Sequence, residues 1–205
     1  MHNAQQTMTK TRRSTHVRIL QATSEVVLSK GIQAATVQDI LKAAGVCRRT
    51  FYQYFPNKES VLEGLYRTMA TDRLVAKIDS AIASTTEPFA KVLVTIDAFL
   101  EFEREGGRLL VLLQSEALRG DSPLSTARLE VLDALVLRIE QTVQQELGVS
   151  FDPLIYRTLF LGIEGLLVHE QRSGVLDDAG MHRIRGIIRP MVISIFASAP
   201  HLPTV

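Results

Sequence analysis

Apolar residues recur at helical spacing along most of the chain, and no segment shows a convincing apolar–polar alternation of a half-buried strand. Glycine and proline residues mark most of the points at which this spacing is interrupted. The pattern predicts an all-α fold of about nine helices. The predicted helices cover residues 12–29, 37–44, 48–54, 58–83, 88–105, 108–118, 124–147, 153–173 and 178–198.

The segment TVQDILKAAGVCRRTFYQYFPNKESVL, residues 36–62, predicts a helix-turn-helix followed at once by another helix. Thr36 and Asp39 form the pattern of a capping box, with Asp in place of the usual Glu or Gln. Gly45 stands where the tight turn needs a left-handed backbone conformation, and Asn57 is suited to cap the next helix. Adjacent arginines and two tyrosines in the second helix suit a helix that enters a DNA groove.

Charge is distributed unevenly along the chain. Residues 1–58 hold nine basic and two acidic side chains, whereas the remaining residues hold 14 basic and 20 acidic ones, so a net charge of +1 hides a basic N-terminal region. A basic region of this kind is the expected footprint of phosphate binding. Charge alone also fits an ordinary solvated surface, and the motif is what favours DNA.

The chain resembles the TetR family of bacterial transcriptional regulators over about a quarter of its length. The resemblance rests on Lys30-Gly31, on Thr36-Val37-x-Asp39-Ile40-x-x-Ala43-Ala44-Gly45-Val46, and on Thr50-Phe51-Tyr52-x-Tyr54-Phe55-x-Asn57-Lys58-Glu59-x-Val61-Leu62. It implies a three-helix DNA-binding domain over residues 1–56 and an effector-binding and dimerisation domain over residues 57–205. Residues 1–10 are polar, and we expect them to be disordered. Beyond residue 70 only the number and length of the helices agree with the family.

On this resemblance we expect a cytoplasmic homodimer that binds an inverted-repeat operator as a repressor and is released by a small-molecule effector. An activator, or a regulator whose ligand promotes DNA binding, fits the same fold. A different class is a helical ligand carrier or protein-interaction module whose DNA affinity is weak and indifferent to sequence.

Matching positions supply the candidate DNA contacts. Arg48 and Arg49 begin the recognition helix, where an arginine fork fits guanine O6 and N7. Gln53 fits adenine, and Lys58 at the next helix start fits a phosphate. The full candidate set is Arg12, Arg13, Thr36, Cys47, Arg48, Arg49, Thr50, Tyr52, Gln53, Tyr54 and Lys58, with Arg12 and Arg13 as part of a basic arm.

Cys47 replaces the serine or threonine that is frequent at its position in the family. One interpretation is a tolerated substitution. The other is a redox-sensitive thiol, because a helix N-terminus beside two arginines lowers the pKa of a thiol.

The resemblance also implies a small-molecule pocket among helices four to eight. Its candidate lining is Tyr66, Met69, Phe89, Phe99, Phe102, Leu113, Gln114, Tyr156, Phe160 and Glu164. Most of these residues also suit an ordinary core. Glu164 is unusual as an acid in an apolar stretch, and pairing with Arg128 or Arg138, an interface or a ligand would each account for it.

The eighth predicted helix is apolar on nearly all sides, so it needs partners on more than one side. It is either a central core helix or a helix shared with a second subunit, and we favour the second. The predicted dimer interface is Leu154, Thr158, Leu161, Gly162, Gly165, His169, Ile188, Val192 and Ile195.

The sequence contains no motif of a hydrolase, a zinc protease, a phosphate-binding loop or a dinucleotide-binding fold, so we expect no enzyme. The histidines lie at no metal-ligand spacing, and we expect neither a metal nor a cofactor. The single cysteine fits a reducing compartment. The N-terminus has no apolar run typical of a signal peptide, and the apolar runs are too short to span a bilayer.

Overall fold

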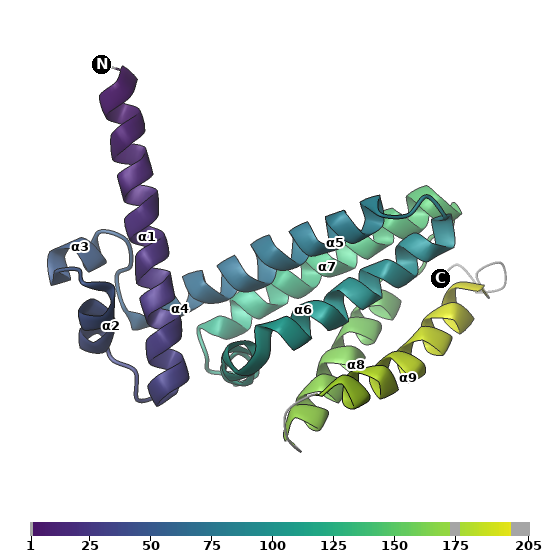
Figure 1. Ribbon diagram of the computed structural model, residues 1–205. Helices are drawn as coiled ribbons and strands as arrows, with labels where there is room; N and C mark the ends of the chain where they lie inside the picture. The colour runs from purple at the N-terminus through teal and green to yellow at the C-terminus, as the bar shows by residue number, and fades with distance from the viewer. Residues whose placement is uncertain (1, 173–176, 198–205) are drawn as a thin grey trace. The chain divides into compact units, whose positions relative to one another are not determined.

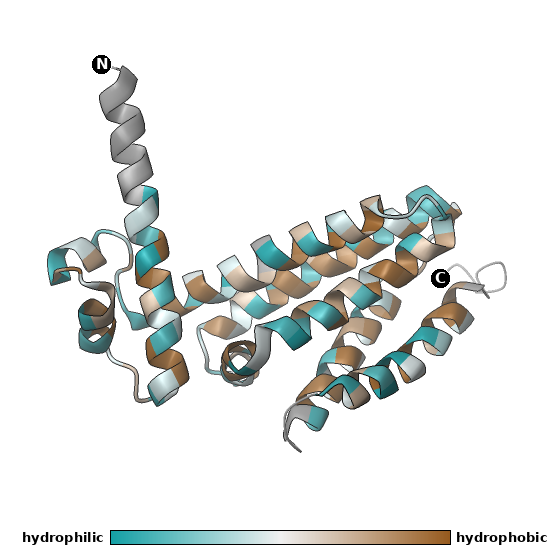
Figure 2. Ribbon diagram, in the orientation of Figure 1, coloured by the Kyte–Doolittle hydropathy of each residue, from teal (hydrophilic) through white to brown (hydrophobic). Residues whose placement is uncertain are grey.

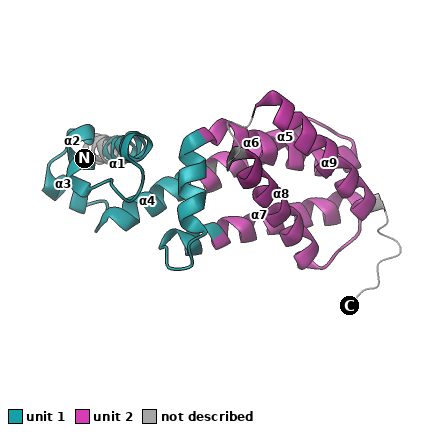
Figure 3. Ribbon diagram, turned by 90° about the horizontal axis from the view of Figure 1, so that it is seen from below, with its two compact units in different colours: residues 1–69, 108–128 teal, residues 70–107, 129–205 magenta. Residues whose placement is uncertain are grey.

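The computed structural model describes residues 2–172 and 177–197, and within these ranges it contains helices and no strands, which confirms the all-α fold class (Figure 1). The elements are α1 (His2–Lys30), α2 (Val37–Ala44), α3 (Arg48–Tyr52), α4 (Lys58–Arg67), the π-helix η1 (Thr68–Arg73), α5 (Leu74–Ala83), α6 (Pro88–Ala117), α7 (Leu124–Leu147), α8 (Pro153–Arg172) and α9 (Asp178–Ala197). The chain divides into two compact units, which Figure 3 distinguishes by colour.

Unit 1 comprises residues 1–69 and 108–128, so it joins the first four helices to the C-terminal part of α6 and the start of α7. Helix α1 packs against both α2 and α4. The centre of this packing has no exposed side-chain surface at all. It is formed by Ile19, Val27, Ile40, Phe51 and Val61.

Unit 2 comprises residues 70–107 and 129–205. Ion pairs join its neighbouring helices: α5 to α6, α5 to α7, α6 to α7, and α7 to α8. The pairs are, in that order, Lys77–Glu105, Asp79–Arg138, Lys91–Glu146 and Asp133–Arg157. Arg185 of α9 lies 3.3 Å from Glu101 and 3.6 Å from Asp97, both on α6. Unit 1 includes residues 108–128 and so does not coincide with the predicted DNA-binding domain, residues 1–56. The division into functional domains at residue 56 stays a prediction.

The first helix begins earlier than the sequence predicted. Helix α1 starts at His2 rather than at about Arg12 and runs through residues for which we expected disorder. No glycine or proline interrupts residues 2–11, and Ala, Gln, Met and Lys have favourable helix propensities, so the helix can continue back from its packed part.

Two of the predicted helices contain irregular turns. The helix predicted over 58–83 is interrupted by the π-helical turn Thr68–Arg73. The predicted break at Gly106-Gly107 falls inside the helix named α6, where Gly107 has φ 51° and ψ −147°. Only glycine adopts such a conformation without strain, so the break depends on this residue.

Candidate nucleic-acid interface

Helix α2 begins with the predicted capping box. Asp39 N donates to Thr36 Oγ1 at 3.2 Å, and Thr36 N donates to Asp39 Oδ2 at 3.1 Å. Lys30 Nζ lies 2.5 Å from Asp39 Oδ1. The hydrogen bonds from Lys30 and then Thr36 lower the pKa of Asp39 from 3.8 to about 2. Gly45 ends the helix with φ 59°, the predicted left-handed conformation.

Helix α3 presents its candidate base-reading side chains to solvent. Phe51 has no exposed surface and anchors the helix in unit 1. Arg48, Arg49 and Tyr52 are exposed, while Thr50 is half-buried. The helix ends at Tyr52, earlier than the predicted residue 54, and Tyr54 N donates to Phe51 O only three residues back, as in a tightened last turn. Gln53 and Tyr54 therefore lie in the turn after the helix, and Gln53 is also exposed.

His16 of α1 supports the end of this turn, a contact that we did not predict. Its imidazole stacks on the ring of Phe55 with centroids 5.1 Å apart, and lies 6.1 Å from the ring of Tyr54. The sequence contained a signal, because His16 stands one helical turn before Ile19 and Leu20 on the buried face of α1.

Cys47 is the exposed residue that precedes α3, and its side chain makes no capping hydrogen bond. Its Sγ lies 3.2 Å from Thr50 Oγ1. The hydrogen bond from the Thr50 hydroxyl lowers the pKa of the Cys47 thiol. The predicted effect on the pKa is therefore present, but its main cause is Thr50 rather than the two arginines.

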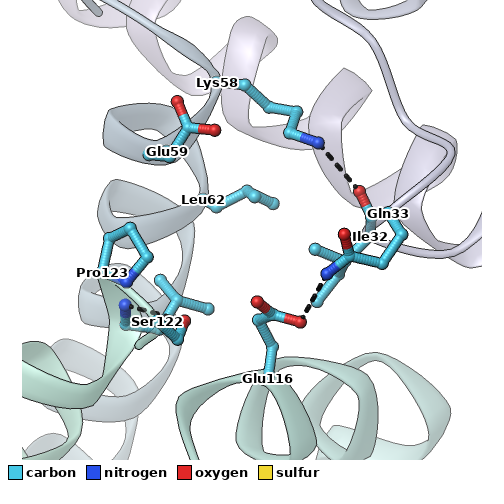
Figure 4. A pocket seen from close by; sticks show the side chains of 9 residues that line it. Ile32, Gln33, Lys58, Glu59, Leu62, Glu116, Ser122 and Pro123 are labelled. Atoms are coloured by element: carbon cyan, nitrogen blue, oxygen red, sulfur yellow. Dashed lines mark hydrogen bonds between the residues drawn. The ribbon is translucent and has the colours of Figure 1, made fainter. Parts of the chain in front are cut away.

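Helix α4 begins with the predicted Asn57 cap, whose Oδ1 accepts from Ser60 N at 2.7 Å. The next residue, Lys58, is half-buried and donates from Nζ to the Ile32 carbonyl at 3.2 Å. Figure 4 shows this contact beside a cavity of about 100 Å³ in unit 1. Opposite it, Gln33 Nε2 donates to Glu116 Oε2 at 2.9 Å. The predicted phosphate contact of Lys58 stays a prediction, and neither internal contact was foreseen.

The remaining DNA candidates lie on α1 and at the start of α2. Arg13 and Thr36 are exposed. The side chain of Arg12 lies outside the residues whose side chains the structure describes. On the described surface, Arg13, Thr36, Arg48, Arg49 and the α3 turn therefore supply cationic and hydroxyl groups on unit 1, which suits phosphate and base contacts.

The ten candidates for an effector pocket are largely core residues. Tyr66, Met69, Leu113 and Gln114 are buried in unit 1, and Phe99, Phe102, Tyr156 and Phe160 are buried in unit 2. Phe89 and Glu164 are half-buried. None of the ten lines either the 100 Å³ cavity of unit 1 or the apolar groove along α8 and α9. Their role in ligand binding stays a prediction.

Packing in unit 2 accounts for several of these side chains. The rings of Phe99 and Phe160 meet edge to face with centroids 5.3 Å apart. Tyr156 stacks on Phe196 at 6.0 Å. Burial, and then the charge of Glu140, raise the pKa of Tyr156 to about 12. Arg138, a predicted partner of Glu164, pairs with Asp79.

Helices α8 and α9 of unit 2 contain many apolar residues, drawn as brown segments in Figure 2. A groove of about 600 Å³ runs along their surface, lined by Leu154, Ile155, Thr158, Leu159, Gly162, Ile163, Leu166, Ile188, Met191 and Ile195. Leu154 is 63% exposed and Met191 is 49% exposed. Neighbouring apolar side chains with this exposure are typical of a protein–protein interface or a ligand-binding groove.

The predicted interface residues divide between this surface and the core. Those that are exposed on α8 are Leu154, Thr158, Leu161, Gly162, Gly165 and His169. On α9, Ile195 is half-buried and Ile188 is almost wholly buried at the base of the groove. Val192 has no exposed surface in the single chain, and its predicted contact with a partner stays a prediction. Ile187, Met191 and Ile193 are the exposed apolar residues there.

Within residues 2–172 and 177–197, no helix combines the length and apolar composition needed to cross a membrane. The same part of the chain contains no group of three or more His, Cys, Asp or Glu residues arranged to hold a metal ion.

Residues 19–65 match the family model described as bacterial regulatory proteins, tetR family. The transcriptional activator FasR of Mycolicibacterium smegmatis is 33% identical over 96 residues, which is 45% of this chain and 43% of FasR. The transcriptional repressor KstR2 of the same organism is 28% identical over 101 residues, 49% of each chain. The chain thus aligns with about half of these relatives or less.

The fold extends the likeness to nearly the whole chain. The regulator FadR from Bacillus subtilis, solved in complex with stearoyl-CoA, superposes with a TM-score of 0.68 and 20% sequence identity. The match covers 90% of this chain and 99% of FadR. At this identity the likeness concerns the fold alone.

Proposed function

The chain belongs to the TetR family of bacterial regulators, and from this premise we propose that it is a sequence-specific DNA-binding regulator of transcription. The observation that carries the proposal is the exposed pair Arg48 and Arg49 at the start of α3. The buried Phe51 anchors this helix, and the preceding helix α2 begins with a capping box. In a helix-turn-helix, residues at the start of the recognition helix meet base edges in the major groove.

We assign base reading to Arg48, Arg49 and Gln53. Arginine pairs bidentately with guanine and glutamine with adenine. Thr36, Thr50, Tyr52, Tyr54 and Lys58 would contact phosphates or bases, with Arg12 and Arg13 contributing from α1. Cys47 lies beside these groups. Residues 1–56 act as the DNA-binding domain, and residues 57–205 bind the effector and form the dimer.

The active form in this proposal is a homodimer that pairs through the apolar face of α8 and α9. Exposed Leu154, Leu161 and Met191 support this, because a monomer would leave them in water. Gly162 and Gly165 have no atom within 4 Å of an added Cβ, so a partner helix can approach closely there. A two-fold dimer reads an inverted repeat, which fits the operator expected for this motif.

We propose repression relieved by a small effector as the output, acting on cytoplasmic DNA. KstR2 is a repressor, whereas FasR is an activator, so the sign of regulation needs its own test. The first effector class to test is a long-chain acyl-CoA, because FadR, which shares this fold, was solved with stearoyl-CoA. Its acyl chain would suit an apolar site.

Selection of bound duplexes from a random DNA pool at physiological salt, followed by sequencing, tests the proposal. Recovery of an inverted repeat supports a dimeric sequence-specific regulator. Recovery of no sequence above background, with and without stearoyl-CoA, contradicts it and favours the ligand-carrier or protein-interaction class. Reporter expression from the selected site then separates repression from activation.

A further inference from the structure

The chain passes between the compact units at three places, and at two of them a helix is irregular. The passage from residue 69 to 70 lies inside the π-helical turn Thr68–Arg73. The passage from residue 107 to 108 lies at Gly107, whose φ of 51° and ψ of −147° break the helical path of α6. Regular helices bend little except at such defects, and π-turns are frequent at functional sites. The third passage, from residue 128 to 129, lies inside α7, so the two irregular places are the ones at which a helix can bend most easily.

On the unit 1 side of Gly107, the C-terminal segment of α6 is fastened to the DNA-binding helices. Glu116, near the end of that segment, accepts the hydrogen bond from Gln33 Nε2 at 2.9 Å. Glu116 is itself partly shielded, with a side chain that is 16% exposed. A hydrogen bond to an ionised carboxylate is stronger than one between neutral groups. The two residues are 83 positions apart in the sequence, so the bond joins distant segments.

A second bond holds the same loop from the other side. Lys58 at the start of α4 donates to the carbonyl of Ile32, the residue next to Gln33. Figure 4 shows both bonds reaching the loop between α1 and α2 beside the small cavity. This loop leads into Thr36, the cap of α2. The position of this loop therefore affects the placement of α2, the first helix of the helix-turn-helix.

We propose that the hydrogen bond between Gln33 and Glu116 is a latch. It fixes residues 108–117 of α6 to the DNA-binding domain, and α6 bends at Gly107. Gln33 and Glu116 are then positioning residues for DNA recognition rather than DNA contacts. A change in α6 before Gly107 would reach α2 through this bond, in addition to any path through α4. The effect on DNA rests on the proposed function, whereas the latch itself does not.

Exchange of the two side chains tests the latch. Gln33→Glu places two carboxylates together and breaks the bond, whereas Glu116→Gln retains a neutral one. The double variant Gln33→Glu with Glu116→Gln restores the bond in reverse, since the amide is then at position 116 and donates to the carboxylate at position 33. The measurement is amide hydrogen exchange of residues 32–36 in the DNA-free protein.

We expect Gln33→Glu to speed this exchange by about tenfold, the scale of one lost hydrogen bond to a charged group. The double variant should return to about twice the wild-type rate or less. Equal exchange in all variants, or a double variant as fast as Gln33→Glu, overturns the latch. Because no DNA is present, this result is independent of the proposed function.

Operator affinity, measured on the selected duplex, tests the coupling. Gly107→Ala forces an alanine into a conformation that disfavours it, whereas Gly106→Ala changes a residue with ordinary helical φ and ψ. We expect Gly107→Ala and Gln33→Glu to alter operator affinity by about fivefold or more. Gly106→Ala and the double exchange variant should stay near wild type. Affinity that is unchanged by both Gly107→Ala and Gln33→Glu overturns the coupling, while a wild type that binds no DNA contradicts the proposed function alone.

Discussion

The imidazole of His16 stacks on the ring of Phe55, with centroids 5.1 Å apart and planes inclined by 29°. Phe55 follows α3, a helix of only five residues. Such a short helix is not stable by itself, because nucleation costs more than one turn returns. Its position therefore depends on contacts with α1, of which this stack is one.

We expect His16→Ala to reduce the free energy of unfolding by about 0.5–1.5 kcal/mol, the usual range for an aromatic pair. His16→Phe should keep most of the stability because it retains a ring at this position. Urea unfolding at pH 7 measures both. The matched control is Val17→Ala, since Val17 is the next residue on α1 and is 44% exposed. A control that is as destabilised as His16→Ala would show that the stack contributes nothing specific.

Local chemistry was predictable from the sequence where the interacting residues are close together in the chain. The Thr36–Asp39 box and the left-handed Gly45 follow from spacing and glycine conformation, and the structure confirms both. The Gln33–Glu116 bond was not predictable, because it joins residues 83 positions apart that only the tertiary fold brings together.

The α8–α9 surface shows the same limit. Apolar composition indicated that these helices need more than one partner, but composition does not determine which side of a helix faces its own core. In the structure Val192 is buried, while its neighbours Met191 and Ile193 are exposed. The ligand pocket could not be located either, since core aromatic residues and pocket aromatic residues look alike in a sequence.

Arg48→Ala and Arg49→Ala should each relax base preference at one position of each half-site, at a cost of about 1–3 kcal/mol of discrimination. Lys58→Ala should instead weaken binding to all sequences alike and flatten the dependence of affinity on salt. Competition of variant duplexes at two salt concentrations distinguishes the two effects. Unchanged specificity in both arginine variants would show that other residues read the bases.

Asp39 should make stability depend on pH in the acid range. Its pKa is lowered from 3.8 to about 2 by Lys30 and Thr36, so its ionised form is favoured in the folded state. The resulting stabilisation is fully present above its unfolded pKa and is lost as the pH falls through about 2. Asp39→Asn cannot ionise, so the stability difference from wild type should shrink between pH 4 and pH 2. Denaturant unfolding across that interval measures it, and a constant difference would rule out the Asp39 charge as the source.

Thr50 should control the reactivity of Cys47, because its hydroxyl hydrogen bond lowers the pKa of the thiol. Thr50→Val removes the hydroxyl at similar volume, so alkylation by iodoacetamide should reach its half-maximal rate at a higher pH. Thr50→Ser keeps the hydroxyl and should behave as wild type. Cys47→Ser supplies the background rate. Identical pH profiles for Thr50→Val and wild type would exclude this hydrogen bond as the cause.

Alkylated wild-type protein also tests whether Cys47 lies at the DNA interface. An added group beside Arg48 should obstruct the approach of DNA, so operator affinity should fall on alkylation. Protein carrying Cys47→Ser and treated in the same way should bind as before. Unchanged binding by fully alkylated wild type would end the redox-switch interpretation of this thiol.

The apolar face of α8 and α9 should hold the homodimer together. Leu154→Glu combined with Met191→Glu places two charges on the groove, and burying them against a partner is unfavourable. We expect the dimer dissociation constant to rise by roughly 100-fold or more, as measured by analytical ultracentrifugation over a concentration series. The control is Leu137→Glu on α7, because that leucine is 54% exposed and lies outside the groove. Circular dichroism should show intact helices in every variant. A monomeric double variant can also be tested for binding to a single operator half-site. If the control dissociates as well, or if the double variant still dimerises with wild-type affinity, the subunit contact lies elsewhere.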